Sequence, residues 1–219
     1  MPRKKTTTVP INQSVHALND RIAADNRRRF KQHGLLVLNL LSSPGSGKTA
    51  LLERTLVDLK QSLRMGVIVG DLQTDNDAQR LAGKGAPVVQ ITTQDVCHLE
   101  ADMVSRAAST LPLQDLDVLF IENVGNLVCP ATFDLGEDLR VVLVSVTEGE
   151  DKPLKYPVIF KNAHVVLITK MDLAEAVGFD REAATRAIRR IAPQATLMEI
   201  SAKTGAGMDQ WYALLKSFR

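Results

Sequence analysis

Cysteine is scarce in this chain, with two residues among 219, and aromatic side chains make up only 4% of it. Two cysteines can form at most one disulfide, too few to stabilise a domain of this length, which argues against a disulfide-stabilised secreted fold and favours a reducing cytoplasm. No apolar run approaches the roughly eighteen residues that a membrane-spanning helix needs. The basic N-terminus leads into threonines instead of an apolar signal core, so we expect no export.

An excess of either charge is also missing. The chain has 27 lysines and arginines against 25 aspartates and glutamates, a formal net charge of +2. This balance predicts no nucleic-acid partner and no membrane partner. The apolar fraction of 45% and the length suit one sizeable globular domain with a short extension.

The order of the segments predicts three parts. Residues 1–10 are charged and threonine-rich, and we expect a disordered tail. Residues 11–33 carry apolar side chains such as Leu18 and Ile22 at near-helical spacing, which predicts an amphipathic helical arm that Gly34 ends. Residues 34–219 form the main domain.

Within the main domain, apolar runs alternate with helical patterns. The expected strands are 35–41, 66–70, 87–92, 117–123, 139–147, 164–169 and 196–200. The expected helices are 47–63, 75–82, 95–109, 180–191 and 205–217. Strands that are apolar throughout are typical of a sheet buried on both faces. The alternation predicts an α/β fold with a mostly parallel sheet and helices on both faces.

A phosphate-binding loop is indicated between the first strand and the following helix, at residues 42–49, SSPGSGKT. Backbone N–H groups of such a loop, with the helix N-terminus, surround phosphate oxygens. Lys48 would reach the β and γ phosphates, and the Thr49 hydroxyl would bind Mg²⁺. Ser42 stands where the pattern has glycine, and a chance Gly/Ser loop is the alternative. The expected nucleotide contacts here are Pro44, Gly45, Ser46, Gly47, Lys48, Thr49 and Ala50.

Two later elements predict that the base is guanine. Thr169-Lys170-Met171-Asp172 follows a strand, and the Asp172 carboxylate can accept from the paired N–H donors of guanine, which adenine lacks. The Lys170 stem would lie across the purine. Ser201-Ala202-Lys203 follows the last strand and offers backbone N–H groups to guanine O6. In this order after a phosphate-binding loop, the two elements predict a GTPase.

The γ-phosphate sensor is expected after the strand at 117–123, where Glu122 would hold Mg²⁺ and the Gly125 N–H would meet the phosphate. Among the acidic residues at 71–77 we favour Asp75 as a Mg²⁺ or water ligand, although an acidic helix start is an equal alternative. The expected catalytic set is Lys48, Thr49, Asp75, Glu122 and Gly125. Asn126 is a candidate for orienting water. No arginine finger is evident, which predicts slow turnover.

Both cysteines lie near these elements. Cys97 and His98 are expected in the first turn of the helix at 95–109, where the helix dipole would favour a thiolate. Cys129 follows Gly125 closely. Two thiolates and an imidazole suit Ni²⁺ or Zn²⁺, while structural cysteines or a labile disulfide remain alternatives. Because Cys129 is attached to the γ-phosphate sensor, hydrolysis would move one metal ligand.

Five runs of the chain are long enough to compare with known families: 70–78, 97–101, 121–131, 133–137 and 147–157. These runs resemble the hydrogenase nickel-incorporation GTPases, the HypB family. The resemblance implies a SIMIBI-type GTPase, a nucleotide-dependent homodimer, and a nickel chaperone for [NiFe]-hydrogenase large-subunit precursors that works with a HypA-like metallochaperone. It also implies that Cys97, His98 and Cys129 bind nickel or zinc at or near the dimer interface.

Three departures from the family pattern narrow these expectations. The first 33 residues have no cysteine and only His16 and His33, so a separate high-affinity nickel store is not expected. Asp102 stands where many members have a second histidine. Ser43 replaces the lysine that crosses the dimer in MinD-like ATPases. The rival interpretations are a urease nickel accessory GTPase, a P-loop small-molecule kinase, and a metal buffer with a vestigial nucleotide site.

Overall fold

The sheet predicted from the sequence is present, and it is parallel throughout. The computed structural model describes residues 11–73, 76–94 and 96–218. Within them, seven strands run in the order β3-β2-β4-β1-β5-β6-β7, and every neighbouring pair is parallel. The strands are β1 (Leu36–Ser42), β2 (Met65–Asp71), β3 (Val88–Thr92), β4 (Val118–Glu122), β5 (Leu139–Ser145), β6 (Val165–Thr169) and β7 (Thr196–Glu199).

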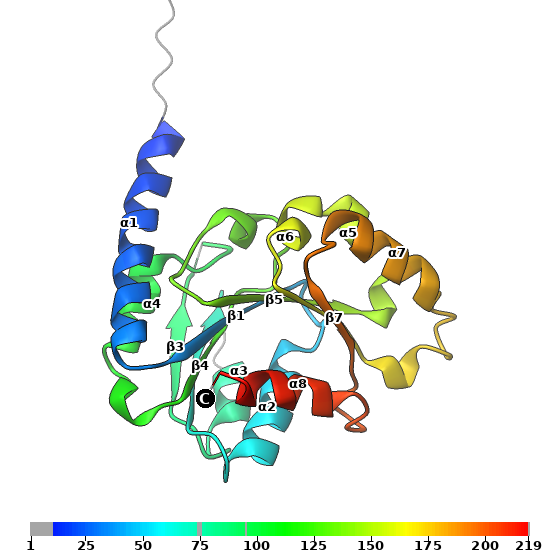
Figure 1. The fold of residues 1–219 in the computed structure, drawn as a ribbon. Helices are drawn as coiled ribbons and strands as arrows, with labels where there is room; N and C mark the ends of the chain where they lie inside the picture. The colour runs from blue at the N-terminus through cyan, green and yellow to red at the C-terminus, as the bar shows by residue number, and fades with distance from the viewer. Residues whose placement is uncertain (1–10, 74–75, 95, 219) are drawn as a thin grey trace, which may run out of the picture.

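Helices cover both faces of this sheet (Figure 1). One face carries α2 (Lys48–Leu59), α3 (Asn76–Leu81) and α8 (Met208–Lys216). The other face carries α1 (Ile11–Gln32) beside α4 (Ala101–Ala108), and, over the other half of the sheet, α5 (Lys152–Lys155), α6 (Pro157–Lys161) and α7 (Arg181–Ile191). Short 3₁₀ turns include η2 (Cys129–Thr132). The predicted fold class is confirmed.

The alternation of side chains along β1 shows how the core is divided. Leu36, Leu38 and Leu40 point into the cluster under α2 and α8. Val37 belongs to the cluster under α1 and α4, and Leu41 to the cluster under α6 and α7. All are nearly or fully buried, as strands with two covered faces require. Parallel strands all end at one edge, so the loops that follow them gather there.

Two expectations from the sequence fail. The helix expected over 95–109 begins only at Ala101, and Cys97 and His98 lie in bends before it. The helix dipole therefore does not act on the Cys97 thiol in the way predicted. The structure also has two short helices, α5 and α6, that the pattern did not predict. Each has proline at its first or second position, where the missing N–H costs nothing.

The helix α1 lies over most of the range predicted as an amphipathic arm. The predicted disordered tail, residues 1–10, lies outside the described residues, and the division of the chain into tail, arm and main domain stays a prediction. No helix among the described residues combines the length and apolar character that crossing a membrane requires.

Candidate nucleotide and metal site

The phosphate-binding loop connects β1 to α2 as predicted. Its backbone needs glycine at two points, because Gly45 and Gly47 have φ values of +74° and +102°. Ser42, the departure from the glycine pattern, has a use here: its Oγ accepts a hydrogen bond of 2.9 Å from Lys48 Nζ. Burial lowers the pKa of the Lys48 amine, and the charge of Glu122 is the largest influence that raises it. A buried cation at the end of this loop suits a phosphate ligand.

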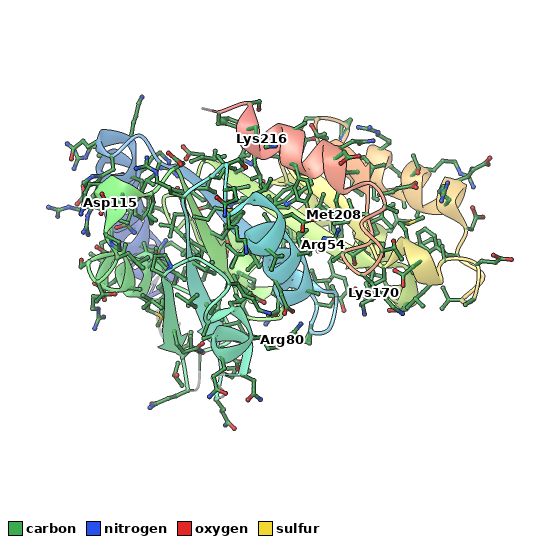
Figure 2. All side chains as sticks on the ribbon, turned by 90° about the horizontal axis from the view of Figure 1, so that it is seen from below. Arg54, Arg80, Asp115, Lys170, Met208 and Lys216 are labelled. Atoms are coloured by element: carbon green, nitrogen blue, oxygen red, sulfur yellow. The ribbon has the colours of Figure 1, made fainter. Side chains whose placement is uncertain are left out.

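A cavity of about 480 Å³ opens above this loop at the carboxyl edge of the sheet. It is lined by loop residues, by the ends of β2 and β4, and by Asp77 and Arg80 of α3. In Figure 2 Arg80 and Lys170 lie on the lower side of the view, and Lys216 lies on the upper side. Sequence reasoning did not single out Arg80, which also pairs with Glu53 at 3.1 Å.

Glu122 lies at the end of β4, beside β1, in position to act with Thr49. The Thr49 hydroxyl donates to Glu122 Oε1 at 2.7 Å, while the buried Oε2 has no hydrogen-bond partner among the described residues. Burial raises the pKa of the Glu122 carboxyl to about 7. A buried carboxylate oxygen without a partner, next to a threonine hydroxyl, is a donor set that fits Mg²⁺. Asp75, the favoured third ligand, lies outside the described residues.

Gly125 meets the phosphate-binding loop directly. A Cβ at this position would lie 2.9 Å from Pro44 Cα and 3.0 Å from Pro44 N. Only glycine therefore allows the two backbones to approach this closely. Asn126, the candidate for orienting water, is engaged elsewhere: its Oδ1 accepts from the backbone N–H of Val128 at 2.8 Å and of Cys129 at 3.4 Å.

The predicted guanine elements lie on the other side of the phosphate-binding loop. A cavity of about 250 Å³ there is lined by the predicted residues Lys170, Asp172, Ala202 and Lys203, together with Gly47 and Ala50. Ser201 Oγ donates to Asp172 Oδ1 at 2.6 Å and so orients this exposed carboxylate. Lys170 Nζ donates to the Gly45 carbonyl at 2.7 Å.

Two further side chains hold the loop, and sequence reasoning gave them no role. Thr169, in the place where GTPases usually have asparagine, donates from Oγ1 to the Ser46 carbonyl at 2.6 Å. Ser46 Oγ in turn donates to Glu148 Oε1 at 2.6 Å. The Thr169 position was visible as a departure in the motif. Glu148 had no such signal, because its contact joins segments far apart in the sequence.

Cys97, His98 and Cys129 come together. One ligand atom from each lies within 4.8 Å of the others, and among the described residues this is the group of His, Cys, Asp or Glu side chains with metal-ligand spacing. Neither nitrogen of the His98 ring has a hydrogen-bond partner in that part of the chain, and Nε2 lies 3.7 Å from Glu100 Oε1. Two free thiols and an unpartnered imidazole fit a soft or borderline divalent metal.

The protonation of these ligands is set by their surroundings. A hydrogen bond with the Cys97 thiol, followed by burial, raises the pKa of the Cys129 thiol. Burial lowers the pKa of His98, which keeps its imidazole neutral and able to bind a metal. Asp102 forms an ion pair with Arg106 within α4 and is not part of the group that Cys97, His98 and Cys129 form.

The fold and this pair of sites define a P-loop nucleotide-binding protein. Residues 36–199 match the family described as "CobW/HypB/UreG, nucleotide-binding domain". The chain belongs to the HypB family of hydrogenase maturation factors. It is 53% identical over 201 residues to the hydrogenase maturation factor HypB of Escherichia coli K12, covering 92% of this chain and 69% of that protein.

Solved structures agree with this assignment. The fold matches that of HypB from Helicobacter pylori in complex with nickel, with a TM-score of 0.88 and 42% identity, covering 92% of this chain and 95% of the other. FtsY from Mycoplasma mycoides has a TM-score of 0.57 at 16% identity, covering 84% of this chain and 67% of the other, a likeness of fold alone. This family membership favours the metallocentre interpretation over the small-molecule kinase.

Proposed function

We propose that this chain is a GTP-hydrolysing nickel chaperone in which the nucleotide state controls metal binding and delivery during [NiFe]-hydrogenase maturation. Membership of the HypB family supports the maturation role, and the nickel complex of the Helicobacter pylori relative supports nickel as the cargo. Zn²⁺ would fit the same ligands. Thiolate ligands must stay reduced, which suits the cytoplasm.

The nucleotide half of the proposal rests on the charges around the loop. GTP would place its phosphates against the buried Lys48 amine. Without GTP, Glu122 is the main group that favours the charged form of this amine. Mg²⁺ held by Thr49 and Glu122 would neutralise charge that develops on the phosphates. Asp172, oriented by Ser201, would select guanine. No described side chain lies in an evident position to act as general base, so we expect turnover below about one per second.

The coupling half rests on the hydrogen bonds that the segment after β4 makes with the backbone at or beside the metal ligands. Asn123, next to Glu122, accepts at its Oδ1 from the Leu99 N–H at 3.2 Å, directly after Cys97 and His98. Asn126, next to Gly125, accepts from the Cys129 N–H. A shift of the segment after β4 on hydrolysis would therefore change the spacing of the ligands.

The partners in this proposal come from the family. We infer a nucleotide-dependent homodimer, a HypA-like metallochaperone as source or recipient of nickel, and the [NiFe]-hydrogenase large-subunit precursor as destination. The exposed side chain of Val128, beside Cys129, places an apolar group at the surface next to the metal ligands, where a protein that exchanges metal would make contact.

Substitutions in each half test this proposal. Lys48→Ala should abolish GTP hydrolysis, and Cys129→Ala should lower Ni²⁺ affinity by at least about tenfold, since removing a metal ligand costs more than disturbing its support. Val128→Ala is the matched control, because this exposed neighbour offers no ligand atom, and it should leave both properties unchanged. The proposal is wrong if Cys129→Ala binds Ni²⁺ as tightly as the unaltered protein.

A further inference from the structure

Two asparagines of α1 bridge distant parts of the chain. Asn19 Oδ1 accepts from the Ala101 N–H at 2.8 Å, and Asn19 Nδ2 donates to the Asp134 carbonyl at 2.8 Å. Asn26 Nδ2 donates to the Ala101 carbonyl at 2.8 Å and to the Leu135 carbonyl at 3.1 Å. Both side chains are almost fully buried. Each amide thus joins the same two backbone segments.

These two segments are the ones that carry the metal ligands. Ala101 begins α4 directly after the bends that hold Cys97 and His98. Asp134 follows η2, which begins at Cys129. The segments also touch through the rings of His98 and Phe133, whose centroids are 3.9 Å apart. The asparagine bridges therefore tie both ligand-carrying segments to α1.

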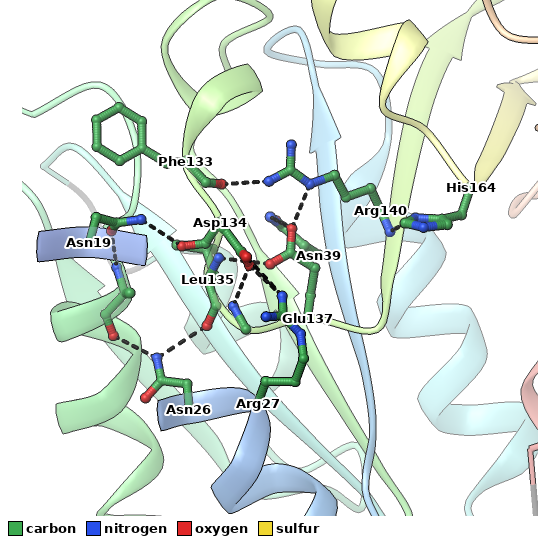
Figure 3. A network of polar contacts seen from close by, with 12 residues as sticks. Asn19, Asn26, Arg27, Asn39, Phe133, Asp134, Leu135, Glu137, Arg140 and His164 are labelled. Carbon is green, nitrogen blue, oxygen red and sulfur yellow. Dashed lines mark hydrogen bonds and ion pairs between the residues drawn. The ribbon is translucent and has the colours of Figure 1, made fainter. Parts of the chain in front are cut away.

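Charged groups hold the segment after η2, which includes Asp134 and Leu135, to α1 and to the sheet (Figure 3). Arg27 donates to both carboxylate oxygens of Asp134, at 2.7 and 2.8 Å. Farther along, Glu137 accepts from the Leu135 N–H at 2.7 Å and from Asn39 Nδ2 at 3.3 Å. Asn123 Nδ2 donates to Asn39 Oδ1 at 3.3 Å. This polar network thus extends from α1 to the residue beside Glu122.

Apolar packing also holds α1 against the domain. Its C-terminal end is anchored by Phe30, which is 2% exposed within the cluster under α1 and α4. An amide that pairs with backbone groups on two segments fixes their spacing, which an apolar contact does not. Groups that hydrogen-bond metal ligands change metal affinity about 10- to 100-fold when removed, and these bridges act on the backbone that carries the ligands.

We propose that α1 is a clasp for the metal site, and that Asn19 and Asn26 are positioning residues that set the spacing between Cys129 and the Cys97-His98 pair. The effect on metal affinity rests on the proposed function, while the effect on spacing does not. Loss of either asparagine frees the two segments to separate, weakens metal binding and leaves the nucleotide pocket in place.

Two measurements on the full chain test the clasp in Asn19→Ala and Asn26→Ala. The first is a Co²⁺ titration that follows the thiolate charge-transfer and ligand-field bands, with Co²⁺ as the probe. The second is the rate at which a short thiol-to-thiol reagent such as dibromobimane joins Cys97 to Cys129 without metal. Phe30→Leu is the control, because it weakens the packing of α1 without touching either bridge.

We expect Asn19→Ala to lower Co²⁺ affinity at least about tenfold, to change the bands, and to slow cross-linking several-fold, while Phe30→Leu leaves cross-linking unchanged. Cross-linking at the unaltered rate in both asparagine variants overturns the clasp. If cross-linking slows but the unaltered protein binds no Co²⁺, the clasp stands and the metal function fails. Asn26→Ala gives the same decision if Asn19→Ala does not fold.

Discussion

The buried carboxyl of Glu122 should make the ligand-free protein less stable as the pH rises. Burial raises the pKa of Glu122 from 4.5 to about 7 in the folded state. Below pH 4.5 the carboxyl is protonated whether the chain is folded or unfolded. Between the unfolded pKa of 4.5 and the folded pKa of about 7, the unfolded chain ionises first, so the free energy of unfolding falls as the pH rises.

The size of this cost follows from the pKa interval. One pKa unit corresponds to about 1.36 kcal/mol. Burial of Glu122 therefore lowers the free energy of unfolding by about 3 kcal/mol above pH 7 and by about 1 kcal/mol near pH 5.5. Glu122→Gln removes the titration but keeps an oxygen that can accept from the Thr49 hydroxyl. The substitution also removes the carboxylate that favours the charged form of Lys48, so about 3 kcal/mol is an upper value.

Urea unfolding of both proteins without nucleotide and Mg²⁺, at pH 5.5 and pH 8, measures the effect. Glu122→Gln should be more stable than the unaltered protein at pH 8, and the difference should shrink by about 2 kcal/mol at pH 5.5. The same substitution should impair Mg²⁺-dependent GTP hydrolysis. A variant less stable at pH 8, or a difference independent of pH, would refute this account of Glu122.

Three further substitutions test other parts of the structure. Asp172→Ala should abolish the preference for GTP over ATP in competition binding, and a preserved preference would contradict the guanine assignment. Gly125→Ala places a Cβ 2.9 Å from Pro44 Cα, so binding of a fluorescent GTP analogue should weaken much more than binding of its GDP counterpart; equal losses would argue against a γ-phosphate contact. Trp211→Phe removes the hydrogen bond of 2.9 Å to Thr55 and leaves a small cavity, which should cost about 2 kcal/mol in urea unfolding; an unchanged midpoint would show that the core repacks.

The sheet was predictable because its strands are buried on both faces. Continuous apolar runs such as 118–121 are typical of strands in a sheet that helices cover on both faces. Their alternation with helical segments predicts that the sheet is parallel. The start of α4 was not predictable. The backbone at Leu99 and Ala101 is bonded to Asn123 and Asn19, which lie far away in the sequence, and a periodic pattern cannot register such contacts.

The candidate site also has parts that could be predicted from the sequence and parts that could not. The phosphate-binding loop and the guanine elements could be proposed from the sequence because each is a short run with its own spacing. Glu148 and Asn19 were missed because their importance comes from the segments that the fold brings to them, Ser46 in one case and Ala101 in the other. The cysteines were singled out by chemistry and scarcity, but only the fold shows their ligand atoms within 4.8 Å.

Control of metal binding by the nucleotide is tested most directly by the Ni²⁺ dissociation constant in GDP and in a non-hydrolysable GTP analogue. Asn123→Ala should be measured alongside, because Asn123 links the end of β4 to Leu99. We expect the two nucleotide states to differ at least about fivefold in Ni²⁺ affinity, and Asn123→Ala to reduce this difference. Equal Ni²⁺ affinity in the two states of the unaltered protein would show that the nucleotide does not control metal binding.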